Sequence, residues 1–220
     1  MIAVLLAAAC QCADTDYKVY VEGETGRFDE DNGKCLDMKG NLLLGKAEVR
    51  DTLEEDGGMV GFLCMNGEQN EERGYYNSGA LKYIEPYKNG KVEGVFKFFY
   101  ESGKLKYGTP YKNGKAEGIE KSFYEIGKLK SEISYKNGKR ERLAKFFYEN
   151  GELERKIMYK NGAQEGETKV FRENGEIWGV FTYKNDKAIS GVCHKTNGET
   201  RPFTKVELEN WDNKLGGTCE

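Results

Sequence analysis

The stretch YKNGK at Tyr111–Lys115 decides the fold, because nearly the same five letters recur along the chain at a fixed interval. Close copies stand at Tyr87–Lys91, Tyr135–Lys139 and, as YKNGA, Tyr159–Ala163, and a degenerate copy, YKNDK, follows at Tyr183–Lys187. The five tyrosines are 24 residues apart each time. A fixed period of this size is typical of a tandem repeat, in which each copy is one supersecondary unit.

Two series of glycines mark the turns of each unit. One belongs to the Asn-Gly pairs, and Asn-Gly between alternating apolar residues strongly favours a tight β-hairpin, since both turn positions need a positive φ. The other glycines alternate with these at spacings of 11 and 13 residues: Gly79, Gly103, Gly127, Gly151 and Gly175. Each unit is therefore predicted to be strand, turn, strand, turn.

The residues between the turns alternate with a period of two. Leu105, Tyr107, Thr109 and Tyr111 are interleaved with lysines, glycine and proline, which is typical of a half-buried antiparallel strand. One unit cannot fold alone, because burying a Phe, a Leu and a Tyr contributes roughly 5–8 kcal/mol, whereas ordering each backbone residue costs about 1–2 kcal/mol. The sequence predicts an all-β fold, an elongated, twisted, single-layer antiparallel β-meander built from 24-residue hairpin repeats.

Charge is segregated along the 220 residues, although the net charge is only -3. Residues 14–73 contain 16 acidic and 7 basic side chains, whereas residues 81–162 contain 19 basic and 11 acidic ones. The basic middle is compatible with an anionic lipid surface or an acidic protein. It is equally compatible with lysines that solvate the outside of a sheet and protect its edges.

The first residues, MIAVLLAAACQC, resemble an export leader. The apolar run is too short to span a bilayer, and small residues precede Cys10, as in a bacterial lipoprotein signal that would be acylated at that cysteine. No Lys or Arg follows Met1, which is a departure from a lipoprotein signal. The alternatives are a simple secretory signal that is cut near Ala9 or Ala13, and a start codon that was assigned too far downstream. We expect export to the periplasm of a bacterium, or anchoring to its membrane as a lipoprotein. Four further cysteines are candidates for disulfides in an oxidising compartment: Cys35, Cys64, Cys193 and Cys219.

Nothing in the sequence indicates an enzyme, a cofactor or a metal centre. His194 is the single histidine and follows Cys193, but neighbouring strand residues point to opposite faces, so they form a poor catalytic pair. The carboxylates recur with the repeat, as solvated turn residues do: Glu101, Glu125, Glu149 and Glu173.

Two aromatic rows accompany the repeat and must lie on opposite faces of the sheet. The tyrosine row is Tyr76, Tyr100, Tyr124 and Tyr148, ending at Arg172. The phenylalanine row lies one residue earlier in each repeat and comprises Phe99, Phe123, Phe147 and Phe171, with Tyr75 before them. If the turns are two-residue loops, Tyr100 pairs with Leu105. If they are three-residue loops with a glycine bulge, Phe99 pairs with Leu105. The length of the turn therefore decides which aromatic row faces outward. Packed lysine stems can cover the outward aromatics; otherwise they form a strip for an extended partner. The candidate binding face comprises Phe99, Phe123, Phe147, Phe171, Lys97, Lys121, Lys145 and Lys169.

The unit FFYESGKLKYGTPYKNGKAEG, Phe98–Gly118, resembles the MORN-repeat variant of bacterial proteins, whose units carry Phe-Tyr, Glu-Asn-Gly-Lys-Leu, Tyr-Lys-Asn-Gly-Lys and Glu-Gly. The resemblance implies a twisted, groove-like β-sheet without catalytic residues. It also implies a likeness to exported proteins labelled YwqK-type antitoxins of toxin–antitoxin systems.

The organisation expected is a leader (1–13), acidic strands and degenerate repeats (14–73), MORN-variant repeats (74–191) and a C-terminal cap (192–220). We expect a non-enzymatic scaffold of the cell envelope that binds a protein partner through the sheet face. The alternatives are an antitoxin-like neutraliser of a toxin and a module that binds anionic lipid. A lipid anchor would add membrane association, nucleic acid is not an expected partner, and the oligomeric state is left open.

Overall fold

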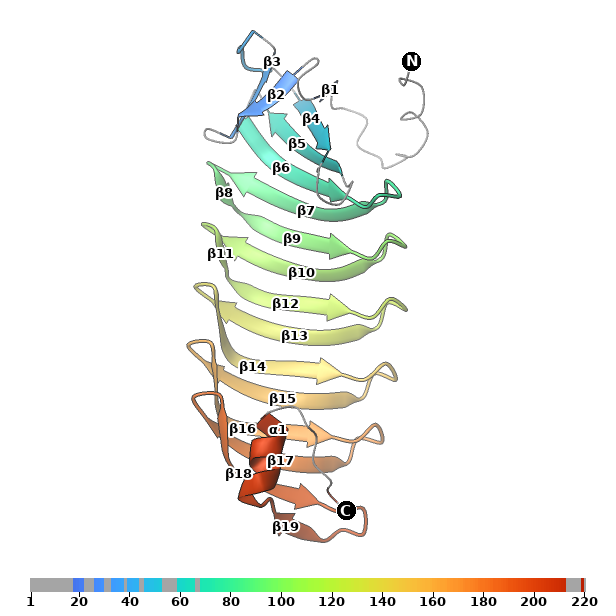
Figure 1. Cartoon of the computed structure of the whole chain (residues 1–220), viewed down its shortest axis with the longest axis vertical. Helices are drawn as coiled ribbons and strands as arrows, with labels where there is room; N and C mark the ends of the chain where they lie inside the picture. Colours follow the sequence, from blue (N-terminus) through green and yellow to red (C-terminus); the bar gives the residue numbers. More distant parts are fainter. Residues whose placement is uncertain are drawn as a thin grey trace. The chain divides into compact units, whose positions relative to one another are not determined.

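The computed structural model describes residues 18–21, 26–29, 33–37, 39–43, 46–52, 59–65, 68–212 and 219. The chain divides into two compact units, residues 1–115 and 116–220. Figure 1 labels the strands and the helix of each. The expected leader at 1–13, with Cys10, lies outside the described residues.

The first unit is an antiparallel meander from β4 onward. β4 to β7 pair in sequence order, and β9 pairs with both β7 and β10. Before them, β2 and β3 form a hairpin, and β1 pairs parallel with β4. The strands are β1 (Lys18–Val21), β2 (Gly26–Asp29), β3 (Lys34–Asp37), β4 (Lys46–Thr52), β5 (Met59–Met65), β6 (Glu68–Tyr75), β7 (Leu81–Lys88), β8 (Lys91–Val92), β9 (Gly94–Phe99) and β10 (Leu105–Lys112).

The second unit continues the same pattern, and each strand from β12 to β18 pairs antiparallel with the next one. The short β11 (Lys115–Ala116) falls at the boundary between the units. The others are β12 (Gly118–Phe123), β13 (Leu129–Lys136), β14 (Lys139–Phe147), β15 (Leu153–Lys160), β16 (Ala163–Phe171), β17 (Ile177–Lys184), β18 (Lys187–His194) and β19 (Thr200–Pro202), followed by α1 (Lys205–Asp212).

The predicted fold class, an antiparallel β-meander of hairpin repeats, is confirmed in both units. Two features depart from a pure meander. First, β1 pairs parallel with β4, so the first strand does not form an antiparallel hairpin with its neighbour in the sheet. Second, the helix α1 was not expected, because eight residues with a single Leu and a single Trp carry little periodicity.

A capping box begins the helix α1. The Thr204 hydroxyl accepts a hydrogen bond from the Glu207 backbone N–H at 3.3 Å, and the Glu207 carboxylate accepts one from the Thr204 N–H at 2.7 Å. The same carboxylate receives two hydrogen bonds from Arg201 of β19, at 2.8 and 3.1 Å. The helix is thus attached to the last strand by a bidentate ion pair.

The apolar core is thin and lies in separate clusters, as expected of a sheet with one main layer. In the first unit Cys35, Leu43 and Cys64 are buried together, with Phe62 against them. In the second unit one cluster lies on β13–β15, with Ile133, Ala144, Ile157 and Tyr159 at its centre. The largest cluster lies where α1 packs on the sheet: Val170, Phe181, Tyr183, Ala188, Cys193, Phe203, Leu208 and Cys219, with Trp178 and Trp211 against it.

Candidate functional site

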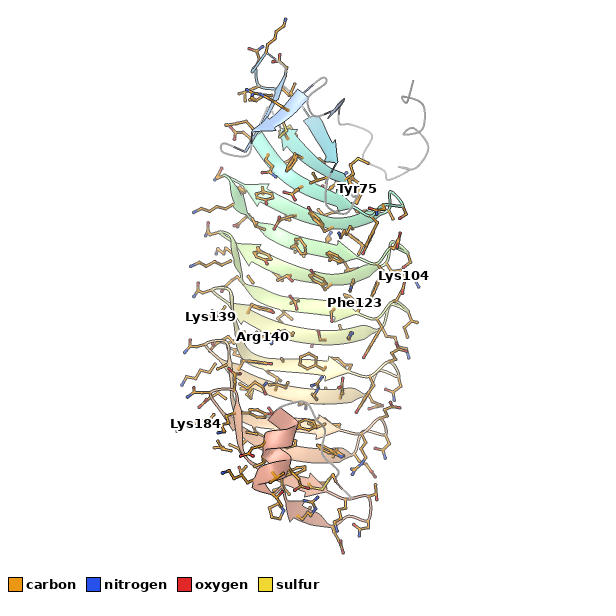
Figure 2. All side chains as sticks on the ribbon, in the orientation of Figure 1. Tyr75, Lys104, Phe123, Lys139, Arg140 and Lys184 are labelled. Carbon is orange, nitrogen blue, oxygen red and sulfur yellow. A yellow bond between two sulfur atoms is a disulfide. The ribbon has the colours of Figure 1, made fainter. Side chains whose placement is uncertain are left out.

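The turns of the Tyr-Lys-Asn-Gly copies are two-residue hairpin loops. In each of these four turns Asn and Gly both have a positive φ, for example 52° at Asn113 and 76° at Gly114. The flanking residues pair directly, as Lys136 does with Lys139. In Figure 2 the turn residues Lys139 and Lys184 lie along one edge of the second unit. The fifth copy keeps this conformation with Asp186 (φ 65°) in place of glycine.

The second series of turns is one residue longer. We call it the Ser-Gly class, after its first two members, and its glycines are Gly79, Gly103, Gly127, Gly151 and Gly175. The Tyr100 N–H donates to the Lys104 carbonyl at 2.8 Å, and the Gly103 N–H donates to the Tyr100 carbonyl at 2.9 Å. Glu101, Ser102 and Gly103 therefore form a three-residue loop that ends in a left-handed glycine (φ 80°). Phe99 pairs with Leu105, which is the second of the two registers considered above.

A β-bulge follows each of these loops and corrects the expected alternation. Leu105 pairs with Phe99 and Tyr107 pairs with Phe98, so Lys106 is an extra residue. The same shift recurs in the second unit, where Leu153 pairs with Phe147 and Arg155 with Phe146. A simple period of two predicts that Leu105 lies on the same side of the sheet as Tyr107 and Tyr111. The extra residue Lys106 reverses the alternation directly after Leu105, so Leu105 lies on the opposite side.

The residues of the candidate binding face share one side of the sheet in each unit. We call this side, with Lys97 and Phe99 in the first unit, the lysine–phenylalanine face. In the second unit it carries Lys121, Phe123, Lys145, Phe147, Lys169 and Phe171. Each lysine lies two residues before its phenylalanine on the same strand, so both point the same way.

Exposed aliphatic side chains lie among these lysines. Ile119, two residues before Lys121, is 53% exposed, and Met158, which is opposite Leu143, is 40% exposed. In the first unit Val95, two residues before Lys97, is 44% exposed. The lysines are partly neutralised, since Glu132 lies 3.4 Å from the Lys121 ammonium and 3.6 Å from that of Lys145.

The opposite side of the second unit, which we call the tyrosine face, carries Tyr135, Tyr159 and Tyr183 beside the buried Ile133, Ile157 and Phe181. Over its last strands it is covered by α1 (Figure 1), whose Trp211 indole donates to the Tyr183 hydroxyl at 3.0 Å. The Trp211 ring also stacks on Phe181 with 4.9 Å between centroids. Part of this face is therefore a docking surface already used within the chain.

Two hydrogen-bond ladders connect successive repeats and were not found from the sequence. Tyrosine hydroxyls donate to a backbone carbonyl 23 residues further on, for example Tyr124 to Phe147 at 2.6 Å and Tyr148 to Phe171 at 2.7 Å. A glutamate at the equivalent position of four repeats, followed by Gly or, at Glu141, by Arg142, accepts from the Asn N–H of the next two-residue turn: Glu93 from Asn113, Glu117 from Asn137, Glu141 from Asn161 and Glu165 from Asn185. The strict 24-residue period of both residues was the signal that could have revealed them.

The four cysteines that the sequence offers as disulfide candidates are joined in two disulfides in the structure. Cys35 is bonded to Cys64 and Cys193 to Cys219. The Cys193 sulfur is therefore engaged and buried, and His194 lies next to it with its carbonyl accepting a hydrogen bond from Arg172 at 2.6 Å. The turn carboxylates Glu101, Glu125, Glu149 and Glu173 are exposed.

Within the described part of the chain, no group of three or more His, Cys, Asp or Glu side chains is arranged to hold a metal ion. Among these same residues, no helix combines the length and the apolar character needed to cross a membrane.

Two types of turn, a recurrent bulge and inter-repeat ladders define a class of protein, the β-meander repeat protein. The model of the MORN repeat variant matches the chain at residues 68–89, 92–113, 116–137, 143–161 and 164–185. Residues 68–185 are thus five tandem MORN repeat variants. No curated protein matches the sequence significantly.

Proposed function

We propose that the protein is a non-enzymatic scaffold of the cell envelope that binds a protein partner through the lysine–phenylalanine face. The observation that carries this proposal is the exposure of aliphatic side chains between lysines, at Ile119 and Met158 of the second unit. Exposed apolar side chains that cluster on one face, bordered by charges, are a mark of an interaction surface. MORN repeats supply a regular surface of this kind and no catalytic residue.

The partner that fits this surface is an acidic, extended segment. Its apolar side chains would cover the aliphatic groups, and its carboxylates would lie near the lysines. Because charges at an exposed surface are screened by salt, binding should weaken as ionic strength rises.

The test is capture of a partner from the cell-envelope fraction, followed by its identification and by binding with purified components. The double substitution Ile119→Ser/Met158→Ser should abolish capture of the partner that the unmodified protein retains. Ile126→Ser is the matched control, because Ile126 is 58% exposed but lies in a Ser-Gly class turn. Equal capture by all three proteins would contradict the proposal.

Two further functions are distinguished by related measurements. An anionic-lipid module would bind phosphatidylserine or phosphatidylglycerol vesicles in a salt-sensitive manner. The pairing of Lys121 and Lys145 with Glu132 reduces the positive charge available for this and favours a protein partner. An antitoxin-like neutraliser is supported by the family resemblance alone, and would rescue growth when co-expressed with a toxin encoded by a neighbouring gene.

We also propose that the protein is exported, to the periplasm of a bacterium or as a lipoprotein acylated at Cys10. The pairing of all four cysteines beyond the leader supports an oxidising compartment. Mass spectrometry of the mature N-terminus after cell fractionation tests this, since it distinguishes an acylated Cys10 from simple cleavage. An intact N-terminus on a protein in which Cys35, Cys64, Cys193 and Cys219 are free thiols would contradict export.

A further inference from the structure

The tyrosine face of the second unit contains a recess of about 350 Å³ beside the C-terminal end of α1. Val170, Trp178 and Trp211 lie on the side of the sheet opposite to the lysine–phenylalanine face, and Phe171 is the lining residue that also belongs to that face. The recess does not include Ile119 or Met158, which carry the proposal above. It is lined by Tyr148, Glu154, Arg155, Val170, Phe171, Arg172, Trp178 and Trp211.

The recess lies where the repeats stop resembling one another. At the bulge position the earlier repeats have lysines that lie over the ring of the row tyrosine, for example Lys106 at 5.4 Å from Tyr100 and Lys130 at 5.2 Å from Tyr124. The two following repeats replace this lysine by Glu154 and then by Trp178. If this position served only to cover the tyrosine ring, lysine would suit it in every repeat. Its replacement by Glu154 and Trp178 beside the recess therefore points to a different role for this position there.

The neighbouring position changes in the same way. Arg155 occupies the place that Tyr107 and Ser131 hold in the two preceding repeats. Its guanidinium carbon lies 5.1 Å from the centroid of the Phe146 ring, which fixes the orientation of the side chain. The side chain therefore reaches the recess as an ordered cation.

One donor of Arg155, the Nε–H group, has no hydrogen-bond partner among the described residues. Its Nε is 3.2 Å from a Glu154 carboxylate oxygen, but this atom is buried and makes no hydrogen bond of acceptable geometry within the described residues. Arg172, in contrast, donates to the carbonyls of Ile177 at 2.9 Å and His194 at 2.6 Å, and so closes the end of the tyrosine ladder. Arg155 is thus the cation of the recess that is available to a ligand.

The apolar wall of the recess is formed by two stacked indoles. The rings of Trp178 and Trp211 have centroids 5.1 Å apart with an interplanar angle of 29°. A planar or aliphatic group of a ligand can lie against these indole rings. The guanidinium of Arg155 favours a planar anion that accepts two hydrogen bonds, such as a carboxylate.

We propose that this recess is a binding site for a carboxylate attached to an aromatic or aliphatic body. The carboxylate accepts hydrogen bonds from Arg155 and displaces Glu154 from it, while the apolar body packs against Trp178 and Trp211. The two sources of this chemistry are a free small carboxylic acid and the C-terminal carboxylate of a peptide that ends in an apolar residue.

Intrinsic fluorescence reports on the recess directly, because Trp178 and Trp211 are the two tryptophans of the chain and both line it. The probe is N-acetyl-phenylalanine, which does not absorb where tryptophan is excited selectively, and its amide is the neutral control. Saturable quenching or a spectral shift with the acid, and at least about tenfold weaker binding of the amide, is expected, since the ionised partner makes the stronger hydrogen bonds. No saturable change, or equal binding of acid and amide, would overturn the proposal.

Two substitutions at the recess should have opposite effects. Arg155→Gln should weaken binding of the acid by about tenfold or more, and Glu154→Gln should strengthen it, because it removes the competing carboxylate. Arg140→Gln is the matched control, since Arg140 also lies over an aromatic ring, that of Tyr159 at 5.5 Å, but does not line the recess. Circular dichroism verifies that each variant is folded. An affinity that is unchanged by Arg155→Gln in a folded protein would refute the assignment.

A hexapeptide that ends in phenylalanine distinguishes the two sources of the carboxylate. Tighter binding of the peptide than of N-acetyl-phenylalanine, lost on amidation of its C-terminus, indicates a peptide ligand. Equal or weaker binding of the peptide indicates a small acid, and both outcomes retain the site. If no ligand binds at the recess, the capture of a protein partner through the lysine–phenylalanine face is not affected. The recess proposal and the scaffold proposal can therefore be refuted independently.

Discussion

Arg142 is a described residue whose backbone conformation is poorly suited to its side chain. It adopts a left-handed conformation (φ 67°), whereas the corresponding position in the flanking repeats is glycine: Gly94, Gly118 and Gly166, with φ of 115°, 116° and 87°. For an L-residue this conformation costs about 1–2 kcal/mol, since Cβ lies too close to the backbone carbonyl. The side chain is exposed, so packing does not compensate for this cost.

Replacing Arg142 by glycine should therefore stabilise the protein. We expect Arg142→Gly to increase the free energy of unfolding by about 1 kcal/mol, measured by urea denaturation. Arg142→Ala is the control, because it removes the charge but retains the unfavourable conformation, and it should give no such gain. A loss of stability in the glycine variant would mean that the Arg142 side chain makes a stabilising contribution larger than the strain.

At the scale of the element, the hairpin turns are held by carboxylates from the preceding repeat. The Glu141 carboxylate accepts a hydrogen bond from the Asn161 N–H at 2.8 Å, and the same bond occurs in three other repeats. A hydrogen bond to a charged acceptor is stronger than one between neutral groups. The glutamate at this position of each of the four repeats is thus a part of the next turn.

Removing this acceptor should loosen one turn without unfolding the sheet. We expect Glu141→Ala to lower the free energy of unfolding by about 1 kcal/mol and to accelerate hydrogen exchange of the Asn161 amide. Glu149→Ala, at an exposed turn on the opposite edge, should change stability by less than about 0.5 kcal/mol. Equal exchange rates at Asn161 in both variants would show that Glu141 does not hold the turn.

The attachment of α1 to β19 should depend on pH. Hydrogen bonds from the Arg201 guanidinium, together with the Thr204 N–H, lower the pKa of Glu207 to about 2 from its ordinary value of 4.5. Because the pKa in the folded state is below that of the unfolded chain, the stabilisation is fully present above pH 4.5 and is lost as the pH falls towards 2.

Acid should therefore weaken the contact of α1 with the sheet. We expect the fluorescence of Trp211, the helix residue that stacks on Phe181, to shift as the pH is lowered through this window. Glu207→Gln should remove this pH dependence, whereas Glu209→Gln should retain it, because Glu209 has only a distant pair with Lys205 at 3.9 Å. An identical acid transition in the two variants would contradict the role of Glu207.

At the scale of the whole molecule, the two disulfides lie in different units. Cys35–Cys64 belongs to the first unit and Cys193–Cys219 to the second, which also contains both tryptophans. A disulfide stabilises mainly the cooperative unit whose unfolded state it constrains, by about 2–4 kcal/mol.

Each disulfide should therefore affect a different spectroscopic signal. Cys193→Ser/Cys219→Ser should lower the denaturant midpoint seen by tryptophan fluorescence, because Cys219, which follows α1 in the chain, loses its covalent connection to β18. Cys35→Ser/Cys64→Ser should change the far-ultraviolet circular dichroism transition and leave the fluorescence midpoint unchanged. Coincident shifts of both signals in both variants would show that the units unfold as one.

The predictable part of this protein is local. The Asn-Gly pairs, the 24-residue period and the Tyr-Lys-Asn-Gly-Lys phrase are enough to predict the strands, the turns and the fold class, because each depends on backbone preferences of neighbouring residues. The placement of Lys121 with Phe123, or of Lys145 with Phe147, on one side of the sheet follows from their spacing of two. The helix α1 and the parallel pair of β1 with β4 were missed, since neither is a repeat.

The amino-acid sequence by itself determined the hairpin repeat and the residues that share a strand face, since a period of two and a positive φ are properties of the local chain. The tertiary structure decided the rest. Leu105 pairs with Phe99 and Tyr107 with Phe98, and only the hydrogen bonds between the strands show this register. The bulge places one extra residue in one strand, and its position depends on the partner strand as well as on the local sequence. Only packing brings Trp211 onto Phe181 and Arg155 into the recess beside it, because these contacts join segments that are far apart in the sequence.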